Sequence, residues 1–380
     1  MTDRRKLLFL VSEDWFFISH FLVTAQAAIH AGFDVRVALR VKDEARVKTI
    51  EDAGVKLIRI NHVRGFGSPL AMLGDIGNYA RVIRGVAPDV LHLVSLRIVL
   101  FGAVAGILAG ARKRLHAVTG LGVMGASTSA KAKIARRVIG FLLRYPLNGR
   151  NVRLVFENAD DPISLGLNPN DPRHVTVGGA GVDPDAWAVA PLPPGRPLKL
   201  ALVARMVESK GVIEAVEAVQ AARRQGADVT LDLYGDPDPE NPRSITEATL
   251  RQWSQHDGIA WHGRTLDIAR VWRDHHIALV PSRGGEGLPR SLLEAAASGR
   301  AILTTSTPGC DTYVRDGIEG LIVPPADVPA LTKAILRFCA DPTLVTACAQ
   351  AARARLNDGF TTAAVTAKFV AVYQELARSR

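Results

Sequence analysis

The chain has 380 residues, a net charge of +10 and 48% hydrophobic residues, which fits a globular protein with two domains of ordinary size. Its three cysteines form no C-x-x-C pair and no even framework, so we expect a reduced, cytosolic compartment. No apolar run reaches the roughly 18 residues of a membrane span. The nearest run, 98–111, predicts a buried helix, and the first run meets Glu13 and Asp14 too early for a signal peptide.

Short apolar runs rich in β-branched residues alternate with helical patterns through the first half of the chain. One such helical pattern, 21–32, ends on a glycine. Near-continuous apolar strands that alternate with helices predict a parallel sheet covered on both faces. The predicted strands are 6–12, 34–39, 55–60, 89–95, 114–119 and 152–158.

A proline-rich stretch, AVAPLPPGRPLKL at 188–200, predicts the linker between a domain at 1–187 and a second at 201–360. The same alternation then restarts, and we expect 361–380 to form a C-terminal helix that packs back toward the first domain. The fold class is therefore α/β, with two doubly wound, Rossmann-like domains whose ligands bind beyond the carboxyl ends of the strands. The second set of predicted strands is 199–205, 229–235, 259–263, 276–282, 301–306 and 320–325.

The positive charge is concentrated in the first half. Residues 1–190 carry 25 Lys and Arg against 16 Asp and Glu, whereas the remainder carries 22 against 21. No acid occurs between Asp89 and Glu157, a stretch with 11 Lys and Arg. Such asymmetry indicates a surface that meets anions: membrane headgroups, nucleic acid or phosphorylated ligands.

The stretch PSRGGEGLPRSLLEAAASGRAILTT joins a strand, a glycine-rich loop and a helix that begins near Pro289 and stops at Gly299. The free N–H groups at the start of that helix predict a phosphate site. From the loop, Glu286 could accept hydrogen bonds from sugar hydroxyls, and Glu294 in the helix could hold a ribose diol. A helix-dipole contact and a solvated helix position are the ordinary interpretations of single glutamates, but the combination favours a ligand site.

Two cations stand at another strand-to-helix junction. Arg205 follows a strand pattern, and Lys210 precedes a helix. An arginine fork and a lysine point charge together can hold a diphosphate. Alone this pair would also fit a solvated turn, but beside the two glutamates it favours a phosphate ligand.

These segments resemble glycosyltransferase family 4, which has the GT-B fold and is marked by Arg-x4-Lys and Glu-x7-Glu pairs. The resemblance rests on ARMVESKG and EGLPRSLLEAAASGRAILTTSTPGC, and it extends to SHFLVTAQAAIHAGFDV, GAGVD and GLIVPPAD. It implies a nucleotide-sugar donor as substrate, commonly UDP-linked, retention of the anomeric configuration, no cofactor and no bound metal.

The resemblance also implies roles for individual residues. Arg205 and Lys210 would bind the donor diphosphate, Glu286 the donor sugar and Glu294 the ribose. The remaining donor-binding residues would be Gly285, Gly287, Leu288, Gly263, Arg264, Thr119 and Gly120.

The segment after the first strand departs from the family pattern. It is usually a glycine-rich loop, whereas here it reads SEDWFFISHF. We expect a loop whose Trp15 and Phe16 meet the acceptor, because aromatic side chains suit a sugar face or a lipid. His20 is either a polar contact there or a histidine of the core.

The basic segment 129–153 predicts an amphipathic helix that lies either on a membrane surface or, as an ordinary surface helix, with its apolar side in the core. Nucleic acid is not expected, because no reader motif accompanies the charge. GLGVMG at 120–125 lacks the acid that a dinucleotide site wants about 20 residues on. The two DPD motifs, 183–185 and 236–238, are interpreted as turns, and Ser291 has no hydrolase elbow around it.

The sequence thus predicts a metal-independent retaining glycosyltransferase. The resemblance favours bacterial enzymes that extend glycans on undecaprenyl diphosphate, for O-antigen (lipopolysaccharide), capsule or glycoprotein, on the cytoplasmic membrane face. A soluble acceptor, a GT-B nucleotide-sugar epimerase and a non-catalytic nucleotide-sugar binding module stay open as alternatives.

Overall fold

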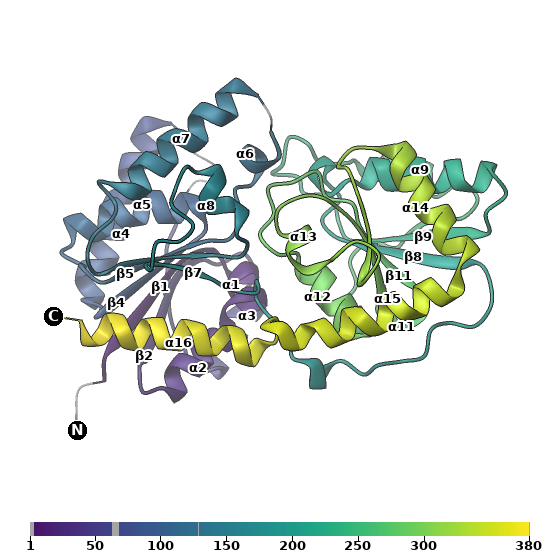
Figure 1. Ribbon diagram of the computed structural model, residues 1–380. Helices are drawn as coiled ribbons and strands as arrows, with labels where there is room; N and C mark the ends of the chain where they lie inside the picture. The colour runs from purple at the N-terminus through teal and green to yellow at the C-terminus, as the bar shows by residue number, and fades with distance from the viewer. Residues whose placement is uncertain (1–3, 63–67, 128, 380) are drawn as a thin grey trace. The chain divides into compact units, whose positions relative to one another are not determined.

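The computed structural model describes residues 4–62, 68–127 and 129–379. The chain divides into two compact units (Figure 1). The first contains 1–121, 129–181 and 362–380, and the second contains 122–128 and 182–361. Residues 182–187 therefore group with the second unit, and the predicted linker 188–200 runs without helix or strand until β8 begins at Leu198.

The first unit is built on a seven-stranded parallel sheet of order β3-β2-β1-β4-β5-β6-β7. Six of its strands match the predicted runs. The seventh was missed because it has three residues at the sheet edge. The strands are β1 Lys6–Glu13, β2 Asp34–Arg40, β3 Lys56–Arg59, β4 Val90–Val94, β5 Arg114–Val118, β6 Val152–Phe156 and β7 His174–Thr176.

Helices cover both faces of this sheet, with α2 and α16 on one face and α4, α5 and α7 on the other (Figure 1). The apolar run at 98–111 lies mostly within α5, which is largely buried, so the prediction of a buried helix is confirmed. The helices are α1 Asp14–His20, α2 Leu22–His30, α3 Glu44–Asp52, α4 Pro69–Val86, α5 Leu96–Leu108, α7 Ala130–Arg144, α8 Asp160–Ser164 and α16 Thr362–Arg378.

The last helix, α16, completes the core of the first unit. Phe369 and Tyr373 are buried among the side chains of β1, β4 and α2. The Tyr373 hydroxyl lies 2.8 Å from Nδ1 of His92 on β4, and Lys113 Nζ donates to the carbonyl oxygen of Ala377 at 3.2 Å. The end of the chain therefore belongs to the first unit although it follows the second in sequence.

The second unit is built on a six-stranded parallel sheet of order β10-β9-β8-β11-β12-β13. Each strand overlaps a predicted run, and β8 begins one residue before its run. The apolar side chains of α9 and α14 cover one face of the sheet, while those of α11 and α12 cover the other. The strands are β8 Leu198–Val203, β9 Val229–Tyr234, β10 Ile259–Trp261, β11 Ile277–Val280, β12 Ala301–Thr305 and β13 Gly320–Val323. The helices are α6 Val123–Ala126, η1 Pro184–Ala186, η2 Glu208–Lys210, α9 Val212–Arg224, α10 Glu247–Trp253, α11 Ile268–Asp274, α12 Arg290–Ala297, α13 Cys310–Tyr313, α14 Val328–Ala340, α15 Pro342–Arg355 and η3 Leu356–Asp358.

Candidate active site

One ion pair at the candidate site joins Lys210 to Glu286. Lys210 ends η2, after β8, and Glu286 lies in the loop after the neighbouring strand β11. The Lys210 Nζ and the Glu286 Oε1 are 2.5 Å apart, and the Ser282 hydroxyl donates to the same oxygen at 3.3 Å. Because β8 and β11 are adjacent and parallel, the two loops meet at one edge of the sheet, and the predicted cation and carboxylate lie together.

Arg205 is held by an acid that sequence reasoning had assigned to a turn. Its Nη1 lies 2.5 Å from Oδ2 of Asp238, a buried side chain in the loop after β9. In the same loop, Asp236 accepts a hydrogen bond from the backbone N–H of Arg264 at 3.0 Å. The second DPD motif therefore lies at the carboxyl ends of the strands and positions two predicted donor residues, Arg205 and Arg264. The strand pattern directly before the motif was the signal that could have predicted this location.

Gly263 and Arg264 follow β10, the strand at the sheet edge. The carbonyl oxygen of Gly263 accepts from the N–H of Gly235 at 2.8 Å, and Trp261 donates its indole N–H to the carbonyl oxygen of Gly235 at 2.8 Å. The loops after β9 and β10 are thus tied together. The place expected for a nucleotide base lies beside the place expected for the diphosphate.

Glu294 lies in α12, which begins directly after Pro289 and ends at Ala297, before Gly299. Its side chain is buried and accepts a hydrogen bond from Nε of Arg290 at 2.7 Å. Burial raises the pKa of the Glu294 carboxyl above its ordinary value, and the nearby charge of Arg290 offsets only part of this rise. The alternative interpretation of Glu294 as a solvated helix residue is therefore wrong. A carboxylate that is buried beside one cation suits a fixed polar contact.

The loop that carries Gly285, Gly287 and Leu288 is backed by a residue to which the sequence assigned no role. Gly309, after β12, has φ +91°, and a Cβ built on it would lie 1.4 Å from the carbonyl oxygen of Gly287. The Leu288 side chain is buried. Only a glycine at 309 allows the two backbones to approach this closely. Gly309 lies in the segment STPGC, which belongs to the family resemblance, but the sequence pattern does not predict its contact with the loop at Gly287.

The remaining predicted site residues lie in the first unit. Thr119 and Gly120 follow the carboxyl end of β5, half-buried. The segment predicted as a loop after β1 is instead the helix α1, which contains Trp15, Phe16 and His20. The rings of Phe16 and His20 lie 4.4 Å apart between centroids.

The reason for the helix α1 is its first residue, Asp14. This buried carboxylate accepts hydrogen bonds from the backbone N–H groups of Lys42 and Asp43, at 2.7 and 2.9 Å, and from Nη1 of Arg46 at 3.1 Å. An acid at a helix start is favourable because of the helix dipole. These contacts fix the first turn of α1, so Trp15 and Phe16 lie on a helix rather than in a loop.

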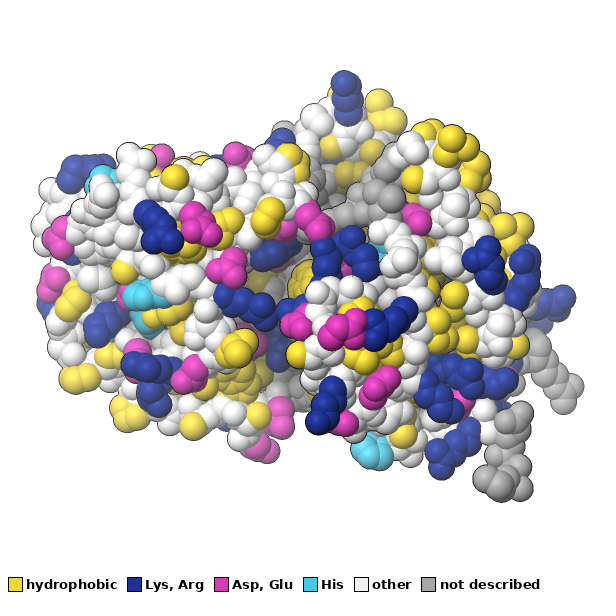
Figure 2. Space-filling view, turned by 180° about the vertical axis from the view of Figure 1, so that it is seen from behind, with side chains coloured by type: hydrophobic (Ala, Val, Ile, Leu, Met, Phe, Trp, Pro, Cys, Tyr) yellow, Lys and Arg dark blue, Asp and Glu magenta, His cyan; other side chains and the backbone are white. Residues whose placement is uncertain are grey.

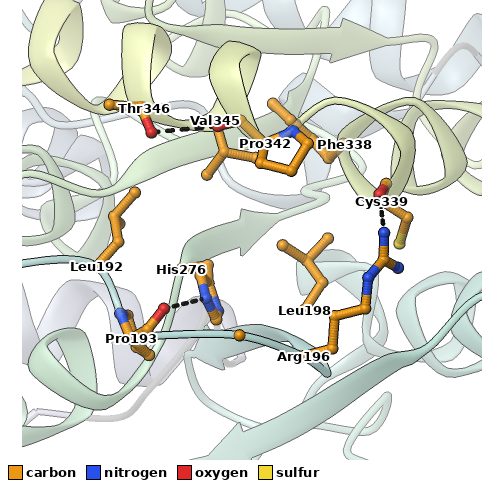
Figure 3. Close-up of a pocket in the computed structure, with 11 residues that line it drawn as sticks. Leu192, Pro193, Arg196, Leu198, His276, Phe338, Cys339, Pro342, Val345 and Thr346 are labelled. Carbon is orange, nitrogen blue, oxygen red and sulfur yellow. Dashed lines mark hydrogen bonds between the residues drawn. The ribbon is translucent and has the colours of Figure 1, made fainter.

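A separate pocket of about 210 Å³ lies in the second unit near the amino ends of β8 and β11 (Figure 3). Apolar side chains such as Leu198 and Phe338 surround it. His276 contacts the carbonyl oxygen of Pro193 through Nε2 at 2.9 Å, and Arg196 donates to the carbonyl oxygen of Cys339 at 3.0 Å. The predicted donor residues follow the opposite, carboxyl ends of the same strands, so this pocket is not their site.

The arrangement at the carboxyl edge can bind a phosphorylated sugar. Arg205 and Lys210 supply positive charge, and Glu286 and Glu294 supply hydrogen-bond acceptors for hydroxyl groups. Across the described ranges, no group of three or more His, Cys, Asp or Glu side chains is placed to hold a metal ion. Nor does any described helix have both the length and the apolar composition to cross a membrane.

Comparison with known proteins identifies two family models on this chain. Residues 6–157 match the model described as "Glycosyl transferase 4-like", and residues 197–341 match "Glycosyl transferases group 1". Together the two models cover every described strand of the two sheets except β7 at His174–Thr176.

Curated relatives match over different lengths. The chain is 25% identical over 320 residues to the N,N'-diacetylbacillosaminyl-diphospho-undecaprenol alpha-1,3-N-acetylgalactosaminyltransferase of Campylobacter jejuni, a match of 80% of this chain and 81% of that protein. It is 31% identical over 143 residues, or 37% of the chain, to exopolysaccharide phosphotransferase SCO2592 of Streptomyces coelicolor, but spans only 15% of that protein. It is 28% identical over 172 residues, or 43% of the chain, to the amylovoran biosynthesis glycosyltransferase AmsK of Erwinia amylovora and spans 42% of it.

Among solved structures, Anabaena Alr3699/HepE in complex with UDP and glucose superposes with a TM-score of 0.76 at 17% identity. The match covers 97% of this chain and 99% of that one. This likeness establishes the GT-B fold that the sequence resemblance implied. With both halves matched by glycosyltransferase models and 97% of the chain superposing on this fold, the chain belongs to the group 1 (family 4) glycosyltransferases.

Proposed function

We propose that this glycosyltransferase moves a sugar from a UDP-sugar to a lipid-linked glycan, with retention of the anomeric configuration and without a metal ion. The observation that carries the donor half is the ion pair between Lys210 and Glu286, 2.5 Å long, at the carboxyl edge of the second sheet. A cation suited to a diphosphate and a carboxylate suited to sugar hydroxyls are adjacent there. A nucleotide sugar offers a diphosphate to the cation and sugar hydroxyls to the carboxylate, and a single bond joins its diphosphate to its sugar.

In the proposed reaction, the bond between the anomeric carbon and the diphosphate oxygen breaks. The acceptor oxygen forms its bond on the same face of the sugar, and its proton passes to the departing phosphate oxygen. Arg205, Lys210 and the N–H groups at the start of α12 stabilise the negative charge that develops on UDP. Glu286 orients the sugar, Glu294 holds the ribose, and Gly263 with Arg264 lies against the base.

The acceptor half of the proposal is supported by two observations. The name of the Campylobacter relative describes a transferase acting on a diphospho-undecaprenol glycan, and residues 90–156 contain no acid. A basic surface suits a diphosphate-linked lipid at the inner face of the plasma membrane. We assign Trp15, Phe16 and His20 to the acceptor side, and Thr119 and Gly120 to the donor sugar. The product would be an O-antigen, capsule or protein glycan.

The donor is tested first by thermal unfolding with UDP, GDP, ADP and NAD⁺. A ligand at about 100 times its Kd adds roughly 2.7 kcal/mol to the free energy of unfolding. We expect UDP alone to raise Tm. A shift with GDP or ADP instead would contradict the uridine assignment, and a shift with NAD⁺ alone would move the site to residues 120–125.

The acceptor is tested by UDP release from a panel of UDP-sugars. Reactions contain a short undecaprenyl diphosphate glycan or the same glycan without its lipid. We expect turnover with the lipid-linked glycan and a product of retained configuration. Equal turnover with the free glycan would favour a soluble acceptor, and an epimerised UDP-sugar without transfer would contradict the proposal.

A further inference from the structure

The helix α7 has one face fixed firmly against the first unit. Ala132, Ile139 and Leu143 are buried on it. A Cβ built on Gly140 would lie 1.7 Å from the carbonyl oxygen of Leu165, which follows α8. This close backbone contact fixes the rotation of α7 about its axis. The opposite face therefore stays on the outside.

The outer face of α7 is apolar as well. Ile134, Val138, Phe141 and Tyr145 are between 52% and 59% exposed. With 3.6 residues per turn, the first three positions form one stripe along the helix. Tyr145 directly follows the helix, and its ring centroid lies 5.0 Å from that of Phe141, so it continues the stripe. An ordinary surface helix is polar on the face that turns away from the core. The outer stripe of α7, defined by these four residues, thus has no role in packing the first unit.

Cations border this outer stripe. Lys133, Arg137 and Arg144 follow one side of it and Lys131 the other, all exposed. The Arg144 guanidinium lies 5.4 Å from the centre of the Tyr145 ring. No acid occurs in the sequence from 90 to 156. On the face drawn in Figure 2, Lys and Arg side chains stand among exposed apolar side chains.

We propose that α7 lies in the surface of an anionic lipid bilayer, with Ile134, Val138 and Phe141 among the acyl chains and the flanking cations at the headgroups. A second copy of this chain fits the stripe less well. A twofold contact would place the cations of one copy against those of the other. The proposal deepens the lipid-linked acceptor of the proposed function, but it uses no property of the donor site.

The test is co-sedimentation of the full chain with vesicles. One set is an equimolar mixture of phosphatidylcholine and phosphatidylglycerol, and the other is phosphatidylcholine alone. We expect binding to the anionic vesicles that weakens with salt and falls about fivefold for Arg137→Gln, the equivalent of about 1 kcal/mol per cation. The double substitution Ile134→Ser and Phe141→Ser should weaken binding roughly tenfold or more, because two apolar side chains no longer leave water.

Leu266→Ser is the matched control, because Leu266 is an exposed apolar residue of the second unit, outside α7. It should bind vesicles like the parent chain. Equal binding to both vesicle types, or unchanged binding by the double variant, would overturn the proposal. Light scattering that shows a dimer in the parent chain and a monomer in the double variant would assign the stripe to self-association.

The donor proposal can fail separately from this one. The double variant should keep the Tm increase with UDP, since neither Ile134 nor Phe141 is among the residues assigned to the donor. Vesicle binding as expected without any UDP effect would leave the membrane proposal standing and refute the donor. A UDP effect without vesicle binding would do the reverse.

Discussion

Gly309→Ala is the sharpest test of how the loop at Glu286 is held. The added Cβ would lie 1.4 Å from the carbonyl oxygen of Gly287 and 3.3 Å from that of Glu286. Side-chain carbons essentially never come within 3.0 Å of such an atom, so one backbone must move by about 1.6 Å, the difference between 3.0 and 1.4 Å. We expect the loop that carries Glu286 to move away from Lys210, because the built Cβ meets the backbone of that loop at two residues.

The expected effect on catalysis is large. A misplacement of about 1 Å at a reacting group can cost roughly 100-fold in rate, which corresponds to about 2.7 kcal/mol of transition-state stabilisation. We expect kcat/KM for the UDP-sugar to fall by about that factor. The left-handed backbone at φ +91° adds about 1–2 kcal/mol of destabilisation to the folded protein.

Gly317→Ala separates the two effects. Gly317 has φ +75°, yet nothing lies within 4 Å of its built Cβ. This control should lose stability through its backbone alone and keep its activity within about twofold, because surface changes away from a site cost little. Both variants are measured by UDP release and by thermal unfolding, at temperatures where each is folded. Equal activities for the two variants would refute the idea that Gly309 positions the loop.

Three further predictions address charge. Lys210→Met should weaken the affinity for UDP, measured by calorimetry, by about 10- to 100-fold, because a charged hydrogen bond of about 1.5–3 kcal/mol is lost. An unchanged affinity would show that Lys210 does not bind the diphosphate. Glu286→Gln should lower transfer about 100-fold while UDP affinity stays within about threefold, and full transfer would end its role at the sugar. His92 and His116 are wholly buried, and burial lowers the pKa of each to about 3. The unfolded chain therefore binds more protons, and the free energy of unfolding should fall by about 2 kcal/mol per histidine from pH 7 to pH 5. Urea unfolding should show that His116→Leu reduces the decline by about 2 kcal/mol, its share of the total; an unchanged decline would contradict the burial argument.

The strands were predictable from sequence because their apolar runs are nearly continuous. Both sheets are covered by helices on two faces, so side chains on both sides of each strand are apolar and the strand is visible in sequence as an unbroken apolar run. Two elements were not predictable. The edge strand β7, His174–Thr176, has too few residues to form a pattern. The helix α1 depends on Asp14 meeting backbone N–H groups at 42 and 43, about 28 residues away along the chain.

The site was predictable only in part, for a related reason. Lys210, Glu286 and Glu294 have recognisable neighbours in sequence, whereas the partner of Arg205 lies 33 residues further on. Asp238 reaches it because β8 and β9 are adjacent in the sheet. Likewise Gly309 contacts Gly287 because β11 and β12 are adjacent. Strand order brings these residues together, and a single sequence gives no direct signal of strand order.

The cations of the candidate site already have carboxylate partners. Arg205 pairs with Asp238, and Lys210 pairs with Glu286. A diphosphate that binds as proposed must therefore replace these carboxylates as the partner of each cation, because neither cation is unpaired beforehand. The exchange has a consequence for recognition of the sugar. When Lys210 turns to the phosphate, Glu286 loses its ion pair and needs new donors, which the sugar hydroxyls supply. UDP alone leaves that carboxylate without them, so the complete UDP-sugar should bind more tightly than UDP, and the preference should vanish in Glu286→Gln.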